Sequence, residues 1–146
     1  MNRIPTITMR VVRESSPAYE SRTISDSDVA VDIARAFIPD DGREHFVGLY
    51  LDQKNRAIAI HEISTGTLTQ SHVHPREAFR PALLLPCAAV IFAHNHPSGD
   101  PTPSRDDSQI TERLVEAGRI LGIRVLDHVI VGSEGSSYSF KKMGGI

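Results

Sequence analysis

The chain has 146 residues, a formal net charge of −2 at pH 7, a hydrophobic fraction of 40% and one cysteine. This length suits one domain with a buried core and is too short for a (β/α)8 barrel of about 250 residues; the single cysteine forbids an intrachain disulfide, and the charge does not support DNA binding through a basic face. No apolar run approaches the roughly 20 residues that span a bilayer and the N-terminus has no signal-peptide pattern, so we expect a cytoplasmic protein without membrane contact.

The N-terminal part is predicted to hold a polar arm followed by a helix. Residues 1–25 are polar and mixed, with a candidate strand at 7–12. Such an arm serves as a sheet edge, as a contact in a homodimer or as loosely ordered chain. Apolar residues at helical spacing predict a helix over 27–37 with Ser27 as its N-cap. We therefore expect an arm over 1–25 and one folded domain over 26–146.

A hairpin and a short helix are expected next. The apolar run at 44–51, the turn at 52–55 and the apolar residues of 57–63 are typical of two antiparallel strands. Residues 67–74 favour another short extended segment. A helix is predicted over 76–85, because one proline precedes it at the first helical position and another ends it.

The C-terminal half predicts the centre of a sheet. Residues 88–93 form a continuous apolar run, which is typical of a strand buried on both faces. A proline-rich loop at 97–103 leads into a helix over 104–121, and strands are expected at 125–131 and 138–140. This order predicts an α/β fold: a single three-layer domain with a central mixed sheet flanked by helices.

The most informative stretch is HNHPSGDPTPSRDD at 94–107. His94 and His96 are two residues apart at the end of a strand, so both rings face the same side and can converge on one ion. Ser104 and Asp107 share the first turn of the next helix, so Asp107 can supply a third, anionic ligand. Two histidines and one carboxylate leave a fourth tetrahedral position for water, as in catalytic zinc sites.

Each part of this pattern also has a structural explanation. A lone His-x-His is weak evidence for a metal, and Ser104 with Asp107 fits a helix capping box. Capping is compatible with a further role for Ser104, but hardly with ligation by the Asp107 carboxylate. His72 and His74 form a second His-x-His, with no carboxylate placed nearby in sequence. The combination of strand end, stiff loop and helix start at 94–107 is nevertheless hard to explain by packing.

The spacing of these residues resembles the signature of a known family. His-x-His, seven residues, Ser, two residues and Asp reproduce the pattern of the JAMM (JAB1/MPN) zinc metalloproteases. The strings HNHPSGDPTPS, HPREAF and VLDHVIVG resemble the RadC-like JAB/MPN branch, and the similarity covers about residues 28–143. RadC-like proteins usually carry a helix-hairpin-helix region before this domain. This chain is too short to hold it, so the DNA-binding role of that region is not transferred.

The resemblance implies a cytidine deaminase-like JAB/MPN fold and a zinc site with the two histidines and Asp107 as ligands. It implies that Ser104 helps to stabilise the oxyanion and that an upstream glutamate acts as general base. Glu44 occupies the matching place at the start of a strand, and Glu62, near the end of the second hairpin strand, is the rival candidate. A glutamate beside a zinc-bound water can take its proton and pass it to the leaving amine.

We therefore expect a zinc-dependent hydrolase, a metallopeptidase or isopeptidase in which a metal-bound water attacks the amide carbonyl of a peptide or isopeptide substrate. The alternative is a non-catalytic or DNA-repair-associated binding module of the RadC type. A zinc nucleobase deaminase is excluded, because neither H-x-E nor P-C-x-x-C occurs in the sequence.

Overall fold

The structure is a computed structural model that describes residues 1–15, 18–19, 22–69 and 72–146. Its strands are β1 (His45–Leu51), β2 (Ala57–Thr65), β3 (Ala89–Asn95), β4 (Arg124–Val131) and β5 (Ser137–Ser139). Its helices are α1 (Ser27–Phe37), α2 (Pro75–Ala78), α3 (Arg80–Leu84) and α4 (Arg105–Leu121).

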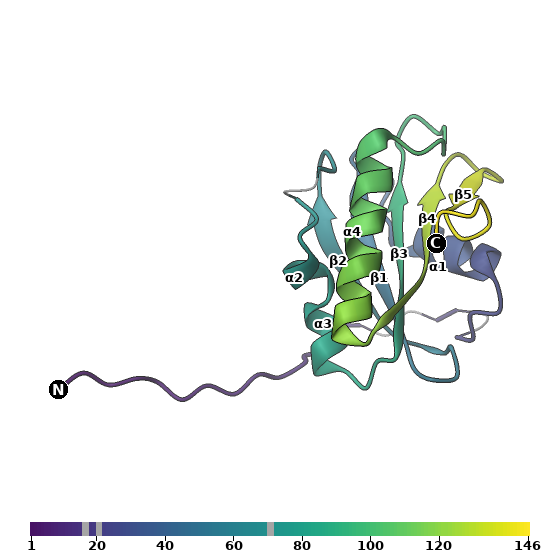
Figure 1. Cartoon of the computed structure of the whole chain (residues 1–146). Helices are drawn as coiled ribbons and strands as arrows, with labels where there is room; N and C mark the ends of the chain where they lie inside the picture. The colour runs from purple at the N-terminus through teal and green to yellow at the C-terminus, as the bar shows by residue number, and fades with distance from the viewer. Residues whose placement is uncertain (16–17, 20–21, 70–71) are drawn as a thin grey trace.

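Within these described ranges, five strands form one mixed sheet in the order β2-β1-β3-β4-β5. Strands β3 and β4 are parallel, and the other neighbouring pairs are antiparallel. Helix α1 packs against β3 and β4 on one face, and α4 covers the other face (Figure 1). The predicted α/β domain with a central mixed sheet between helices is confirmed. The apolar run at 88–93 lies in the central strand, as its lack of polar alternation predicted.

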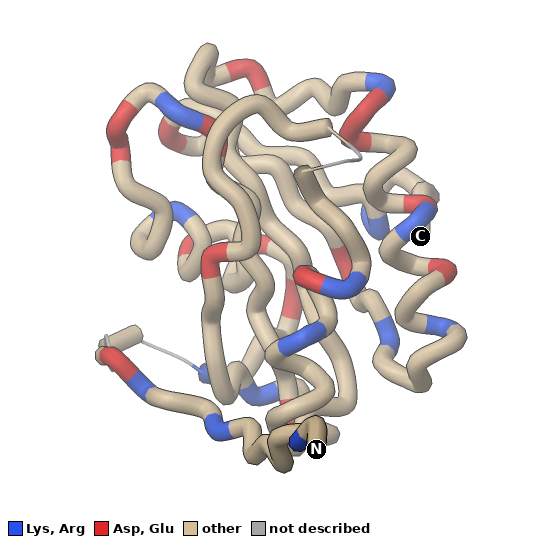
Figure 2. Tube along the Cα trace, turned by 90° about the vertical axis from the view of Figure 1, so that its left-hand side faces the viewer, with Lys and Arg blue, Asp and Glu red and all other residues tan. Residues whose placement is uncertain are grey.

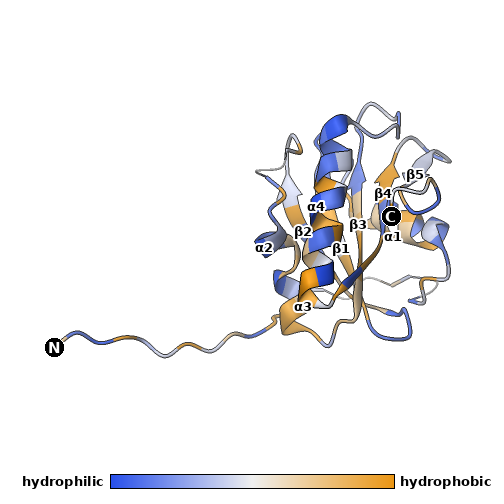
Figure 3. Ribbon diagram, in the orientation of Figure 1, coloured by the Kyte–Doolittle hydropathy of each residue, from blue (hydrophilic) through white to orange (hydrophobic). Residues whose placement is uncertain are grey.

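Alternating side chains of β1 fill the core on both faces of the sheet. Phe46 and Tyr50 point toward α4 and pack in one cluster with Phe92 of β3. Val47 and Leu49 point to the opposite face, where they pack in the clusters formed with α1. Figure 3 shows the matching pattern, with apolar strands inside and polar residues along the outer side of α4. The period of two along a strand thus assigns each residue to one face.

Two predicted helix boundaries differ from the structure. The N-cap of α1 is Asp26 rather than Ser27, because the Asp26 carboxylate accepts hydrogen bonds from the N–H groups of Asp28 and Val29 at 2.9 and 3.1 Å. The single helix predicted over 76–85 is wrong, since the chain breaks at Phe79 into α2 and α3. Pro81 explains the break: its ring lacks an N–H and clashes with the carbonyl four residues earlier.

The N-terminal arm differs from its prediction too. Residues 1–15 adopt neither helix nor strand and extend away from the domain (Figure 1), so the strand predicted at 7–12 is wrong. Residues 22–24 run beside the start of β2, where the N–H of Ile24 donates to the carbonyl of Asn55 at 2.9 Å. The arm therefore meets the sheet only at its C-terminal end within the described residues.

The extended segment predicted at 67–74 falls partly outside the described residues, at 70–71. Its described part contains no strand. Every helix in the described ranges is too short or too polar to cross a lipid bilayer.

Helix α4 approaches the sheet closely through a glycine. A Cβ added to Gly118 would lie 2.4 Å from the carbonyl oxygen of Ile123 and 3.1 Å from a methyl carbon of Val125. The chain returns to β4 through Gly122, which caps α4 in the left-handed conformation with φ 74°. Helix α4 can therefore lie this close to the segment that leads into β4 only because residue 118 has no side chain.

We expect Gly118→Ala to destabilise the protein by about 1–3 kcal/mol, because overpacking against a fixed backbone carbonyl has this cost. Helix propensity alone would stabilise the variant by about 1 kcal/mol, so the sign of the change decides between the two effects. Urea unfolding measures it. Glu112→Ala on the exposed side of α4 is the control and should change stability by less than about 0.5 kcal/mol. A more stable Gly118→Ala protein would contradict this account.

Candidate metal centre

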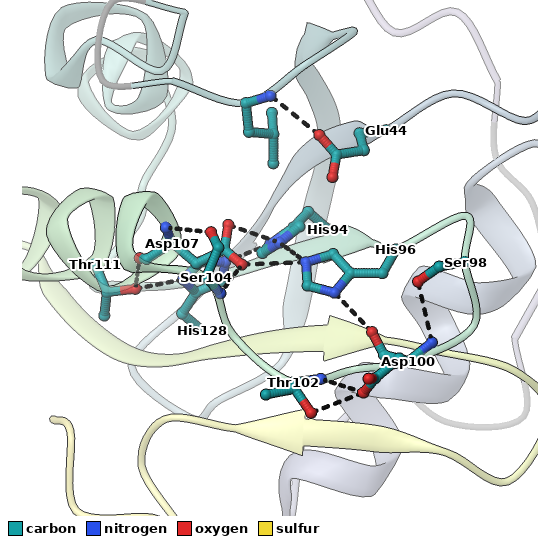
Figure 4. A network of polar contacts seen from close by, with 11 residues as sticks. Glu44, His94, His96, Ser98, Asp100, Thr102, Ser104, Asp107, Thr111 and His128 are labelled. Atoms are coloured by element: carbon teal, nitrogen blue, oxygen red, sulfur yellow. Dashed lines mark hydrogen bonds and ion pairs between the residues drawn. The ribbon is translucent and has the colours of Figure 1, made fainter.

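Three side chains point toward one another where β3 ends and α4 begins (Figure 4). His94 lies in β3, His96 follows its last residue, and Asp107 lies in the first turn of α4. The Nε2 atoms of His94 and His96 are 3.0 Å apart, and the Asp107 carboxylate oxygens lie 3.2 and 3.1 Å from them. Ligand atoms about 2.0 Å from a tetrahedral zinc ion lie about 3.3 Å apart, so this set could hold such an ion.

Local structure keeps the two histidines on one side. The N–H of His96 donates to the carbonyl of Val131 at 3.0 Å, which continues the pairing of β3 with β4 for one residue. The chain then turns at Gly99, whose φ is 87° and whose N–H donates to the carbonyl of His96 at 2.9 Å. This turn brings the loop back to Ser104, where α4 starts beside the histidines.

A buried chain of hydrogen bonds determines which nitrogen of His94 carries the proton. The Thr111 hydroxyl donates to the carbonyl of Asp107 at 2.7 Å, so it accepts from Nδ1–H of His128 at 2.6 Å. The remaining nitrogen of His128, Nε2, then accepts from Nδ1–H of His94 at 2.7 Å. Because His94 has its proton on Nδ1, its Nε2 presents a lone pair to Asp107 and His96.

His96 is oriented in the same way by the loop. Its Nδ1 lies 2.8 Å from the carbonyl oxygen of Asp100, which can only accept, so Nδ1 carries the proton and Nε2 is bare. Two imidazole lone pairs and a carboxylate therefore converge on one point. Only a proton or a metal ion placed among them can make such a cluster of acceptors favourable. The donor set thus fits zinc, which binds neutral imidazole and carboxylate.

The environment of these groups favours a charged Asp107 carboxylate and a neutral His128 ring. Burial would raise the pKa of Asp107, but the adjacent His94 and His96 side chains outweigh burial and hold that pKa well below its ordinary value. The adjacent Asp107 carboxylate raises the pKa of His96, and the charge of Glu44 adds to this effect. Burial lowers the pKa of His128 well below its ordinary value, so this ring is neutral.

The Asp107 carboxylate caps α4 and faces the two histidines at the same time. Its Oδ2 accepts from the N–H of Ser104 at 2.8 Å while the Ser104 hydroxyl accepts from the N–H of Asp107 at 3.1 Å, a complete capping box. The same carboxylate faces both histidines. Capping therefore does not turn this carboxylate away from the histidines, and its two oxygens offer enough lone pairs for both sets of contacts.

Glu44 lies on the face of the sheet that carries the histidines. It precedes β1 by one residue and shares a face with Phe46, whose ring stacks on His94 with centroids 5.8 Å apart. One Glu44 oxygen accepts from the N–H of Leu68 at 3.0 Å. Figure 4 shows the carboxylate held in this way above the three converging side chains.

Glu62, the rival candidate, lies on the other face. It pairs with Val47 of β1, whose side chain packs against α1, and its carboxylate bonds to Nδ1 of His45. Asp41 binds the other nitrogen of His45 at 2.8 Å. Burial lowers the pKa of His45, but its hydrogen bonds with Glu62 and Asp41 outweigh burial and raise it. Glu62 is thus bound to His45 and lies on the face of the sheet opposite to the three converging side chains.

The remaining polar candidates lie outside the cluster. His74 caps α2 by accepting from the N–H of Arg76 at 3.1 Å, and Nδ1 of His72 lies 2.9 Å from the Thr69 hydroxyl. Asn95 turns away from the two histidines and binds the backbone near the start of β1.

Sequence reasoning missed Thr111 and His128. Thr111 lies four residues after Asp107 and therefore on the same side of α4, which is a signal that could have identified it. His128 lies beside Asp127 within the string VLDHVIVG of a predicted strand. Its contact with His94 depends on the register in which β4 pairs with β3, and no local pattern reveals that register.

Comparison with known proteins agrees with the resemblance to RadC-like proteins seen in the sequence. The profile of the RadC-like JAB domain family matches residues 24–145. A UPF0758 protein of Trichlorobacter lovleyi is 57% identical over 105 residues, which cover 72% of this chain and 45% of that protein. A UPF0758 protein of Caldanaerobacter subterraneus subsp. tengcongensis is 56% identical over 102 residues, 70% of this chain and 43% of that protein. The chain therefore spans under half the length of these relatives.

We expect one zinc ion per chain, with Zn–N distances of about 2.0–2.1 Å and a Zn–O distance of about 2.0–2.2 Å. Metal analysis after dialysis gives the stoichiometry, and X-ray absorption gives the distances. Asp107→Ala should weaken binding more than about 100-fold, since even partners behind the ligands typically contribute 10–100-fold. Asp106→Ala, an exposed acid of the same turn, is the control. Equal affinity of the two variants would refute the ligand set.

A second prediction concerns the hydrogen-bond chain from Thr111 through His128 that places the proton of His94 on Nδ1. Thr111→Val keeps the shape of the side chain but removes the hydroxyl that accepts from His128, so zinc affinity should fall about 10–100-fold. Thr111→Ser retains the hydroxyl and should keep the affinity of the wild type. Competition with a fluorescent chelator measures both. If the valine and serine variants bind zinc equally well, the hydrogen-bond chain does not orient the ligand.

Proposed function

The chain belongs to the RadC-like JAB domain family, and we propose that it is a zinc-dependent hydrolase that cleaves amide bonds in peptide or isopeptide substrates. The observation that carries this proposal is the convergence of His94, His96 and Asp107 on one point, with Glu44 on the same face of the sheet. The three groups are two neutral nitrogen donors and one carboxylate, which is a ligand set of catalytic rather than closed structural zinc sites.

The proposed ligands differ in exposure, and this difference indicates where a substrate enters. The side chain of His94 is fully buried and that of Asp107 is 4% exposed, whereas that of His96 is 13% exposed. Ser104 beside them is exposed. The cluster is therefore closed toward the core and open toward Ser104. Zinc bound there would polarise a substrate carbonyl and lower the pKa of water.

Glu44 supplies the group that hydrolysis needs for proton transfer. Its carboxylate is held by Leu68 through one oxygen, so it does not swing into the cluster as a further permanent ligand. The other oxygen remains to accept a proton and to return it to the leaving amine. General bases of this kind contribute about 10²–10⁴-fold to rate.

We infer that Ser104 helps to stabilise a substrate oxygen. Its Oγ accepts from the N–H of Asp107, so the hydroxyl proton is directed elsewhere. Since Ser104 is exposed beside the open side of the cluster, we infer that this proton is donated to the oxygen on which charge develops during attack.

The distribution of charge favours a hydrolase over a DNA-binding module. Figure 2 shows Lys and Arg interspersed with Asp and Glu along the trace of the folded domain, and the chain has a net charge of −2. Binding to the phosphate backbone of DNA relies on clustered basic residues. The relatives extend well beyond this chain, so an activity of their whole length is a separate question.

The proposal is tested by screening the zinc-loaded chain against peptide, ubiquitin-like conjugate and nucleic-acid substrates. Asp107→Ala is the control for contaminating enzymes. We expect cleavage of an amide substrate that zinc removal and Asp107→Ala both abolish. Binding of a partner by the zinc-loaded chain without cleavage of any amide substrate would favour a non-catalytic module.

The third functional prediction concerns the base. Glu44→Gln preserves shape and removes basicity, so turnover should fall about 10²–10⁴-fold while zinc stays bound. Glu62→Gln should leave turnover close to that of the wild type, because Glu62 lies on the other face of the sheet. Steady-state kinetics with zinc analysis of both variants checks this. Loss of turnover in the Glu62 variant alone would transfer the role to Glu62.

A further inference from the structure

The side chain of Asn95 continues the pairing of β1 with β3 beyond the last backbone pair. That ladder ends at Phe46 and His94. One residue further, Asn95 Oδ1 accepts from the N–H of His45 at 2.7 Å, and Asn95 Nδ2 donates to the carbonyl of Arg43 at 2.9 Å. A single amide group therefore holds the backbone on both sides of Glu44.

Further contacts fix the rest of Glu44. Its carbonyl accepts from the N–H of Gly66 at 2.8 Å, and its carboxylate accepts from the N–H of Leu68 at 3.0 Å. Those contacts join Glu44 to the segment after β2. Beyond the last ladder pair of Phe46 and His94, the Asn95 bonds join the backbone on both sides of Glu44 to the strand end that carries the two histidines.

We propose that Asn95 is a positioning residue that sets the distance between the Glu44 carboxylate and the two histidines. This inference rests on the proposed function, because it gives Glu44 the role of the base. Asn95 lies between the histidines in sequence, so any movement of its backbone moves them as well. The amide thus couples the base and the proposed metal ligands as one rigid unit.

The chemistry of this position requires an amide. The carbonyl of Arg43 needs a donor and the N–H of His45 needs an acceptor, and asparagine supplies one of each at the end of a short side chain. Asn95→Asp keeps the acceptor but places a second oxygen against the carbonyl of Arg43. Asn95→Ala removes both bonds and leaves the start of β1 without either contact.

The test compares Asn95→Ala and Asn95→Asp with the wild type by hydrogen exchange, zinc affinity and turnover. We expect the amide of Leu68 to exchange about tenfold faster in both variants, because the carboxylate that accepts from it becomes mobile. Zinc affinity should stay near that of the wild type. Turnover should fall about 10–100-fold at similar KM, as expected for a base displaced by about 1 Å. Asn95→Asp nearly preserves side-chain volume, which guards against a variant that fails to fold.

Thr65→Ala is the matched control, because it removes a hydrogen bond to Glu62 at the same end of the sheet but on the other face. It should leave both Leu68 exchange and turnover unchanged. Adding Asn95→Ala to Glu44→Gln should cause no further loss of turnover, because a positioning residue acts only through the group it positions. A purely structural role for Asn95 would lower turnover further in the double variant.

Two outcomes separate the inference from the proposed function. If Glu44→Gln retains full turnover while Leu68 exchange responds to Asn95, the base is wrong and the coupling is right. If Leu68 exchange is unchanged in both Asn95 variants, the coupling is wrong whatever Glu44 does. A parallel loss of zinc in the Asn95 variants would also overturn it, since the histidines themselves would then have moved.

Discussion

The carboxylate of Asp107 connects the start of a helix to the end of a strand, and the site depends on that connection. It accepts the backbone N–H of Ser104 and faces the Nε2 atoms of His94 and His96 at the same time. A helix begun one residue earlier or later would turn this side chain by about 100° and take it away from the histidines. The capping box that starts α4 therefore also determines where the ligand set can form.

Much of this arrangement follows from local patterns in the sequence. The uninterrupted apolar run of β3 predicts a strand buried on both faces, and it lies at the centre of the sheet. Histidines two residues apart converge because of the period of a strand, and Asp107 reaches them because a stiff loop reverses the chain. Each of these features depends on neighbours in sequence or on a spacing fixed by one helix or strand. A local sequence pattern is therefore enough to predict it.

The features that could not be predicted depend on how distant segments pair. His128 supports His94, and Asn95 holds the start of β1, because of the registers of β4 and β1 beside β3. Glu44 and Glu62 look equivalent as strand-end carboxylates, and only the registers of β1 with β2 and with β3 place them on opposite faces. The break at Phe79 is caused by Pro81, which is visible in the sequence. The effect of this proline on the preceding turn outweighed the apolar pattern that predicted a single helix.

Charge balance gives a reason why a second carboxylate is held close to the ligands but apart from them. Two neutral imidazoles and one carboxylate around a divalent ion leave a net charge of about +1 in a largely buried place, which is costly without a counter-charge. With zinc bound as proposed, Glu44 would supply that charge. A carboxylate so placed would collapse onto the cation if it were free to move. The backbone N–H of Leu68 occupies one of its oxygens, and Asn95 fixes the backbone that carries it. Under the proposed function, the same contacts would keep Glu44 from becoming a ligand and would keep it available as a base.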